Sequence, residues 1–426
     1  MAEKRKDSRG RNLRDGEIQL PDGRYKFQYM DSNDERKAVY SCRLVPTDRT
    51  PAGKRDGKSL REKEEEIEND RRDGIDGKKA SKITLNGMFD LYMAGKTELK
   101  ESTRSNYLYM YKKYVSGTLG KKNLSSIKYS SIKAFYTSLI TEQGFKPNSM
   151  EIIHTILHPV FTLAVRDGYI RNNPTDGVMA EIKKSHNWEK PKRHALTVDQ
   201  QTVFVEFLAK SDMYGRWLPL FTFFLGTGCR VGEVIGLRWE DCDFTNNSIS
   251  INHNLIYRAF RGEDEADHCE MRITTPKTAA GCRTVPMLNE VRKALLTERE
   301  CQLREGPCLD EIDGYTNFIF TNRYNHVHTP HTINRAIERI RLACNAWEAE
   351  RAKKEHRAAV VIPHFSVHNL RHTFCTRFCE NETNIKVIQD IMGHADIGTT
   401  MNIYAEATEQ KKKESFASLE GKIKIS

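Results

Sequence analysis

The sequence predicts a multidomain protein: a small β-sheet-plus-helix unit, then an α-helical unit, then a mixed α+β domain that is mainly α-helical. Its 426 residues exceed what one ordinary domain holds. The pattern changes from short alternating segments to helical periodicity near residue 82, and Gly-, Lys- and Pro-containing segments at 74–81 and 188–194 read as linkers. We therefore expect domains at 1–80, 82–185 and 195–410, and a tail at 411–426.

The composition favours a polyanionic partner. The chain carries 68 Lys and Arg against 58 Asp and Glu, a net charge of +10, which favours a nucleic acid, although Lys-rich surfaces are common. Its ten cysteines are irregularly spaced, and the first residues precede no apolar stretch, so we expect a reducing, cytoplasmic compartment. The longest apolar cluster, 217–225, is too short to span a membrane.

The first sixteen residues carry six Lys and Arg against three acids without periodicity, so we expect a flexible basic arm. Alternating segments at 23–30 and 37–41, bounded by turn residues, predict a small antiparallel sheet, and residues 59–74 predict a helix with Ser59 as its N-cap. So small a unit serves either to present a face to DNA or as a generic β domain. Four side chains on the first alternating segment are the candidates for DNA contact: Arg24, Tyr25, Lys26 and Tyr29.

Residues 82–182 have helical periodicity throughout. Thr103 and either Ser130 or Ser131 are candidate N-caps, and Pro147 opens a third helix whose apolar positions share one face. A compact helical bundle follows from this pattern, and by itself it indicates no function.

The remainder of the chain predicts an α+β domain with a small sheet at one edge. It opens at Thr197 with a capping-box pattern. The expected helices are 198–210, 215–226, 230–237, 331–350, 367–380 and 384–392, and the expected strands are 248–251, 271–274, 283–286 and 318–320.

An anion-binding turn is predicted at 226–237. Gly226 and Gly228 permit a tight turn, after which Arg230 stands at a helix N-terminus, where free N–H groups favour a phosphate. A guanidinium there grips two phosphate oxygens, and Glu233 either holds Arg230 or caps the helix. The alternative is an ordinary surface arginine after a turn.

Lys277 lies between segments rich in Ile, Thr and Val, around a Pro-, Ala- and Gly-containing centre. This pattern predicts a β-hairpin with Lys277 exposed at its tip. Because lysines at such tips often serve solubility alone, Lys277 gains significance only beside the other candidates.

The stretch from 363 to 404 carries the chemistry. His368 and Arg371 lie three apart on one helix face, His394 follows a helix end at Gly393, and Tyr404 comes shortly after. An arginine and a histidine suit phosphate binding and proton transfer near neutral pH.

A rival interpretation is a metal helix, because His368 and His372 lie four apart and cysteines follow. A zinc protease helix needs Glu at 369, where this chain has Asn, and Cys375 and Cys379 suit helix packing. We expect neither a metal nor another cofactor.

Together these segments resemble the tyrosine recombinase (phage-type integrase) family. The shared order is an Arg in a Thr-Gly-x-Arg-x-x-Glu turn, a hairpin Lys, a His-x-x-Arg, a Gly-His and a Tyr. The whole chain is similar to integrases of conjugative transposons, including 45–56 and the segment that begins at Ser59. His394 and Tyr404 are ten residues apart, whereas nine is also common in the family.

The resemblance implies roles for particular residues. Arg230 and Arg371 match the phosphate-holding arginines, Lys277 the leaving-group acid and Tyr404 the nucleophile; His368 and His394 match the two histidines. It also implies that 1–80 binds arm-type DNA repeats and 82–185 clamps the crossover site. The expected partners are double-stranded DNA, a homotetramer on DNA, and excisionase or DNA-bending proteins, with the tail as a docking segment. The function implied is integration and excision of a mobile element.

Two other functions remain open on the same residues. A type IB topoisomerase-like enzyme would use the same chemistry to relax DNA without exchanging strands. A non-catalytic DNA-binding regulator would keep the fold alone. The acidic segment at 263–267 fits no motif.

Overall fold

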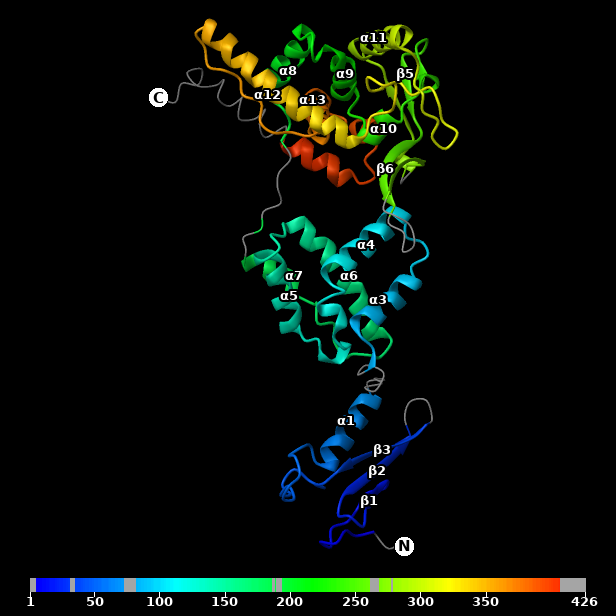
Figure 1. The fold of residues 1–426 in the computed structure, drawn as a ribbon, viewed down its shortest axis with the longest axis vertical. Coiled ribbons are helices and arrows are strands. Elements are labelled where there is room, and N and C mark those ends of the chain that lie inside the picture. Colours follow the sequence, from blue (N-terminus) through cyan, green and yellow to red (C-terminus); the bar gives the residue numbers. More distant parts are fainter. Residues whose placement is uncertain are drawn as a thin grey trace. The chain divides into compact units, whose positions relative to one another are not determined.

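The computed structural model describes residues 5–30, 35–72, 82–185, 188, 194–260, 268–276 and 279–406. The chain divides into two compact units, Met1–Lys190 and Pro191–Ser426. The first contains the sheet-plus-helix segment and the helical segment, and the second contains the α+β domain (Figure 1). Among the described residues, no helix is long and apolar enough to cross a membrane.

The N-terminal segment is a three-stranded antiparallel sheet covered by one helix. The strands are β1 (Glu17–Gln19), β2 (Tyr25–Met30) and β3 (Arg36–Ser41), in the order β1-β2-β3, and the helix is α1 (Leu60–Arg72). Tyr25, Leu44 and Leu60 form its small buried core. The predicted sheet and helix are therefore confirmed. The expected flexible arm is wrong for residues 5–16, because Lys6 and Asn12 form a β-bridge and the buried Asp7 accepts a hydrogen bond from Arg11 (2.8 Å).

The two faces of β2 divide the four candidate DNA contacts. Because side chains alternate along a strand, Tyr25 and Tyr29 lie on one face with Phe27, and Phe27 packs against the core. Arg24 and Lys26 lie on the opposite face, where both cations sit within about 6 Å of the Tyr40 ring.

The expectation that Tyr25 contacts DNA is wrong. Its side chain is 4% exposed, and its hydroxyl donates to Asp7 (3.1 Å) and accepts from Arg11 (3.0 Å). A tyrosine held in this way supports the fold and is not available to DNA. Arg24, Lys26 and Tyr29 remain as candidates, because Arg24 and Lys26 lie beside Tyr40 on the other face and Tyr29 is only partly buried.

The helical segment packs around a single apolar core. Its helices are α3 (Leu85–Ala94), α4 (Glu101–Tyr114), α5 (Tyr129–Thr141), α6 (Pro147–Arg166) and α7 (Val178–Ser185), with 3-10 turns at Leu119–Lys121 and Leu124–Ser126. α6 begins at Pro147 as predicted. α4 begins before the expected cap at Thr103, with Lys100 as N-cap, and Ser131 instead accepts the backbone N–H of Lys128 at the start of α5.

The second unit is mainly helical. Its helices are α8 (Val198–Lys210), α9 (Leu218–Thr227), α10 (Val231–Ile235), α11 (Asn289–Glu305), α12 (Pro330–Lys354), α13 (Val367–Asn381) and α14 (Ile385–Met392). A further helical stretch covers 397–406. α9 is apolar on most sides and packs against α8, α11 and α13, so it forms the centre of the domain (Figure 1).

Most predicted helices are confirmed, and α8 has the predicted limits. Thr197 and Gln200 exchange the two hydrogen bonds of the expected capping box. The prediction omitted α11, although its Ala, Leu, Glu and Arg residues are strong helix formers. Residues 318–320 form only a single bridge with Arg238 and are not a strand.

The strands differ from prediction in their pairing. One sheet has the order β4-β5-β8, from β4 (Cys242–Asp243), β5 (Ser248–Ile251) and β8 (Arg283–Pro286). The other pairs β6 (Asn254–Phe260) with β7 (His268–Thr274) along seven residues. The predicted hairpin around Lys277 is therefore wrong, because β7 and β8 belong to different sheets. The segment between them connects the sheets.

Candidate functional site

Arg230 is held at the junction of α9 and α10. Its backbone N–H donates to Glu233 Oε2 (2.8 Å) and its guanidinium donates to Glu233 Oε1 (2.8 Å). The second terminal nitrogen donates to the Gly393 carbonyl (2.7 Å), which lies 163 residues further along the chain. The predicted association of Arg230 with Glu233 is confirmed, and Glu233 acts both as cap and as ion-pair partner.

A glycine makes this junction possible. Gly228 ends α9 in the left-handed region, with φ of 61°. A Cβ atom there would overlap the Phe374 ring. Both the backbone conformation and the close approach of α13 therefore require glycine.

Arg283 joins the same group from β8. It donates to both oxygens of Glu233 (3.1 and 2.9 Å) and to the Ile391 carbonyl near the end of α14 (2.6 Å). Its side chain is 6% exposed. The arginine thus ties β8, α10 and α14 to one another at the site.

Arg371 reaches the cluster from α13. It donates to the Gly228 carbonyl (2.7 Å) and to the Met392 carbonyl (2.6 Å). Burial, together with the positive charge of Arg230, lowers the pKa of Arg371 to about 10. The guanidinium is therefore still charged at neutral pH, but it is in an environment that disfavours its charge.

The cluster carries an excess of positive charge. Burial would raise the pKa of Glu233, but the hydrogen bond and charge of Arg283 outweigh it and hold that pKa below its usual range. Within the described cluster, one ionised carboxylate thus faces the guanidinium groups of Arg230, Arg283 and Arg371. Because buried charge is costly unless it is compensated, this arrangement favours binding of an anion.

His394 lies beside the arginines. Gly393 caps α14 in the left-handed region, with φ of 63°, and the chain then turns so that His394 Nδ1 hydrogen-bonds Thr400 Oγ1 (2.9 Å). The side chain is 8% exposed. Burial and the charge of Arg371 lower the pKa of His394 to about 4. The imidazole is consequently neutral at pH 7 in this structure.

Tyr404 lies on the helical stretch that follows His394. Its half-buried ring packs with Ile403 against the apolar cluster of α13 and α14, which contains Cys375, Cys379, Ile388 and Met392. The predicted helix after Thr399 is present and begins at residue 397. The tyrosine is therefore held against α13, which carries Arg371, and α14, which ends just before Gly393.

The other sequence-predicted residues lie as follows. His368 is exposed on α13, one turn before Arg371. Cys375 and Cys379 are buried in the apolar cluster, and the described residues contain no group of three or more His, Cys, Asp or Glu side chains suited to a metal. Lys277 lies outside the described residues, as do the acidic segment and the tail.

Sequence reasoning missed Arg283 and Thr400. A signal for Arg283 was present in the sequence. Arg283 and Val285 are two residues apart on one strand, so their side chains lie on the same face, and Val285 is buried. An arginine on the inward face of a strand is a sign of a specific buried partner. No comparable signal identified Thr400, because its contact with His394 depends on the turn after Gly393.

The chain matches three known protein families. Residues 194–411 match the phage integrase family, residues 1–71 the DNA-binding domain of Tn916 integrase, and residues 84–140 the SAM-like N-terminal domain of phage integrases. The chain is 35% identical over 410 residues to the transposase of transposon Tn916 from Enterococcus faecalis, covering 96% of this chain and 95% of that protein. It is 34% identical over 410 residues to the transposase of Tn1545 from Streptococcus pneumoniae, with the same coverage of both chains.

Among solved structures, that of the Tn1549 transposon integrase in complex with circular intermediate DNA is similar to this chain. The TM-score is 0.63 and the identity 26%, covering 78% of this chain and 99% of that one. A lambda integrase tetramer bound to a Holliday junction is similar in fold, with a TM-score of 0.50 and 17% identity.

The charge balance of the cluster predicts that Glu233→Gln strongly lowers the stability of the protein. Losing the carboxylate charge leaves buried arginines without compensation, so the free energy of unfolding should fall by about 3–5 kcal/mol. Thermal and urea unfolding of the second unit measures this. Glu290→Gln is the matched control, because Glu290 is exposed on α11 and should change stability by less than about 0.5 kcal/mol. Equal stability of the two variants would contradict the central role of Glu233.

Proposed function

The chain belongs to the phage integrase family of tyrosine recombinases, and we propose that it integrates and excises a mobile element through a 3′-phosphotyrosyl bond formed by Tyr404. It is a site-specific DNA recombinase similar to conjugative transposon integrases. The observation that carries the proposed mechanism is the buried positive cluster of Arg230, Arg283 and Arg371 around the single carboxylate of Glu233.

Arg230 and Arg371 hold the scissile phosphate. Each donates to backbone carbonyls, at Gly393 for Arg230 and at Gly228 and Met392 for Arg371. An arginine has five N–H donors, so further donors remain for the non-bridging oxygens. These charges are already in place before the reaction, and they stabilise the negative charge that develops in the transition state.

Tyr404 is the nucleophile in this proposal. Its Oη bonds to phosphorus as the bond from phosphorus to the 5′-oxygen breaks. A free tyrosine has a pKa of about 10, so a base must accept its proton. We assign that role to His368, which lies one turn from Arg371, and assign phosphate positioning to His394.

Lys277 donates a proton to the departing 5′-oxygen. This role rests on the family resemblance and on the place of Lys277 in the segment that leads to Arg283. The products are a 3′-phosphotyrosyl enzyme and a free 5′-hydroxyl. Because the covalent bond conserves the phosphodiester, a 5′-hydroxyl from a partner strand can attack it and rejoin the DNA without ATP.

We propose that each domain binds a different part of the DNA. In this proposal residues 1–80 bind arm-type sites, residues 82–185 and 195–410 enclose the crossover site, and the tail at 411–426 docks between protomers. Exchange of strands needs paired active sites, so we propose a homotetramer on DNA in the bacterial cytoplasm, assisted by excisionase and DNA-bending proteins. The Tn1549 integrase bound to circular intermediate DNA supports the DNA assignment, and the lambda integrase tetramer supports the assembly.

The nucleophile is tested with a nicked suicide substrate. Tyr404→Phe should bind DNA with unchanged affinity and form no covalent adduct, because the attacking oxygen is absent. Tyr257→Phe, an exposed tyrosine on β6, serves as control and should form the adduct. An adduct that persists in Tyr404→Phe would overturn the assignment, and binding without any adduct in the wild type would favour a regulator.

The role of Lys277 is tested by changing the leaving group. Lys277→Ala should cleave ordinary DNA at least about a hundredfold more slowly, as expected for loss of a general acid. Replacing the 5′-bridging oxygen by sulfur should restore its rate, because a thiolate leaves without protonation. A variant that is slow on both substrates would place the acid elsewhere.

The arm-binding face is tested by charge reversal. Arg24→Glu with Lys26→Glu should weaken binding to arm-type sites and reduce its salt dependence by about one unit per lost phosphate contact. Cleavage at the crossover site should be unchanged. Lys54→Glu, at an exposed position outside the sheet, is the control. Loss of both binding modes in the double variant would contradict a separate arm domain.

A further inference from the structure

His394 has its backbone and its ring held by different residues. Its N–H donates to the Gln389 carbonyl (3.1 Å), and its carbonyl accepts from the Gln389 side chain (3.0 Å). Its ring contacts a side chain that the mechanism above does not use, since Nδ1 lies 2.9 Å from Thr400 Oγ1. The imidazole therefore has a fixed position, and Thr400 is the residue that sets which ring nitrogen carries the proton.

The fixed ring belongs to the arginine cluster. The two carbonyls just before it in the chain, of Met392 and Gly393, accept from Arg371 (2.6 Å) and Arg230 (2.7 Å). Among the described residues, Nε2 of the imidazole has no hydrogen-bond partner, yet it is not one of the fully enclosed polar atoms. Nε2 is thus the ring nitrogen that remains for a ligand.

Thr400 donates its hydroxyl hydrogen to His394. Its side chain is 0% exposed, and Oγ1 has no second partner among the described residues. The hydroxyl of Thr373, which is equally buried, donates to a backbone carbonyl four residues earlier in its helix (2.8 Å). Thr400 has no such bond, so without Nδ1 as acceptor its hydroxyl would be a buried unsatisfied donor, which is costly. Nδ1 therefore accepts, and the neutral ring carries its proton on Nε2.

This tautomer presents a donor before a phosphate binds. Burial and the positive charge of Arg371 lower the pKa of His394 to about 4, so the ring is neutral in the free protein. Nε2 carries a proton both in the neutral ring fixed by Thr400 and in the imidazolium, so it donates in either state. With the proton on Nδ1 instead, neutral Nε2 would be an acceptor, and an acceptor cannot bind a phosphate oxygen.

Thr400 also lies on the segment that carries the nucleophile. Thr400 and Tyr404 are four residues apart in the helical stretch 397–406, so their side chains share one helix face. Tyr404 packs on the apolar cluster of α13 and α14, and Thr400 is buried. One helical turn thus joins the proposed nucleophile to the residue that orients the imidazole.

We propose that Thr400 is a positioning residue: its hydroxyl donates to His394 Nδ1 and so makes Nε2 a hydrogen-bond donor to a non-bridging oxygen of the scissile phosphate. The assignment rests on the proposed function and deepens it, because it gives the neutral imidazole one tautomer and one task. No proton leaves His394 during cleavage. Its N–H binds the oxygen on which negative charge develops, beside the charges of Arg230 and Arg371.

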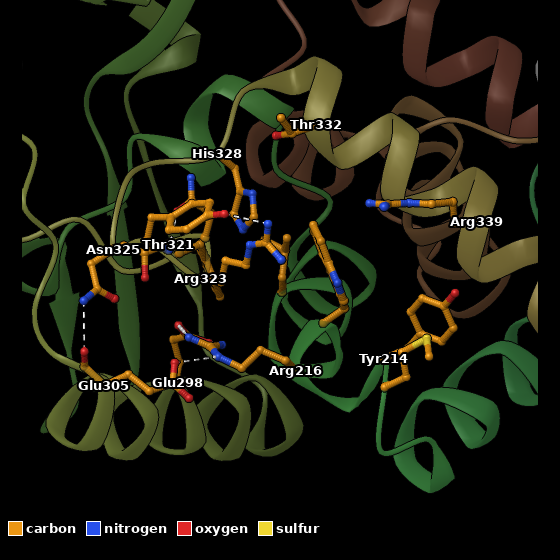
Figure 2. Close-up of a pocket in the computed structure, with 16 residues that line it drawn as sticks. Tyr214, Arg216, Glu298, Glu305, Thr321, Arg323, Asn325, His328, Thr332 and Arg339 are labelled. Carbon is orange, nitrogen blue, oxygen red and sulfur yellow. Dashed lines mark hydrogen bonds and ion pairs between the residues drawn. The ribbon is translucent and has the colours of Figure 1, made fainter.

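The tautomer of His394 is tested by NMR of the full-length protein at pH 7 without DNA. Ring nitrogen-15 shifts distinguish the two neutral tautomers, and the His394 signals are those absent from His394→Gln. The wild type and Thr400→Ser should show the Nε2–H tautomer, whereas Thr400→Val should gain the Nδ1–H tautomer. His328, a buried histidine in a cavity between α9, α11 and α12 (Figure 2), is the internal reference and should not change. An Nδ1–H tautomer in the wild type would overturn the proposal.

Cleavage of a nicked suicide substrate at saturating DNA tests what the hydrogen bond contributes. Thr400→Val should slow adduct formation at least about tenfold and change DNA affinity less than about twofold, because it misdirects a donor that acts in the transition state. Thr400→Ser keeps a hydroxyl and should restore most of the rate. Thr399→Val is the matched control, since Thr399 is exposed on the same helical stretch, and it should cleave as the wild type does. Equal rates for Thr400→Val and the wild type would contradict the proposal.

Sulfur substitution separates this role from a structural one. Replacing either non-bridging oxygen of the scissile phosphate by sulfur gives two diastereomers, and sulfur accepts hydrogen bonds poorly. On the diastereomer that lacks the oxygen bound by His394, the wild type loses the same hydrogen bond. The ratio of its rate to that of Thr400→Val should therefore fall from about tenfold to about twofold or less. An unchanged ratio on all three substrates would show that Thr400 only supports the fold.

The two kinds of measurement fail independently. The tautomer of the wild type needs no variant of Thr400, so it decides the proposal even if Thr400→Val does not fold. A wild type that forms no covalent adduct would refute the proposed function, whereas the NMR result on His394 would still stand.

Discussion

The ion pairing of Glu233 with Arg230 and Arg283 is the interaction on which the catalytic unit depends. One carboxylate receives donors from the start of α10 and from β8, and Arg283 extends the contact to the end of α14. Three segments widely separated in sequence therefore meet at a single charge. Because the carboxylate is buried, its loss would leave cations in a medium that solvates them poorly.

The way in which the arginines are held preserves their charge for a ligand. Arg371 is oriented by the carbonyls of Gly228 and Met392, and Arg230 partly by the carbonyl of Gly393. Carbonyl dipoles fix the direction of a guanidinium without cancelling its charge. Both glycines occupy left-handed conformations, so they allow the helix ends to place these carbonyls at the cluster. The glycines that end these helices therefore also fix the carbonyls that orient the arginines before a ligand binds.

The same charge explains the state of His394. Its low pKa follows from burial beside the arginines, and it keeps the imidazole neutral where a phosphate would bind. A bound phosphate would offset the neighbouring positive charge, which favours protonation of the ring only in the complex.

The resemblance to tyrosine recombinases grouped Arg230, Arg371 and His394 in one site. The sequence by itself determined the order of the domains, most helices, and the position of Arg230 and Glu233 at a helix start. These depend on local periodicity, capping and motif spacing, which nearby residues specify. Tertiary structure alone decided that Arg283 joins the cluster, that Tyr25 is buried, and that β7 pairs with β6 instead of β8. The physical reason is that strand pairing and the partner of a buried charge depend on segments far apart in the chain, and only packing brings those together.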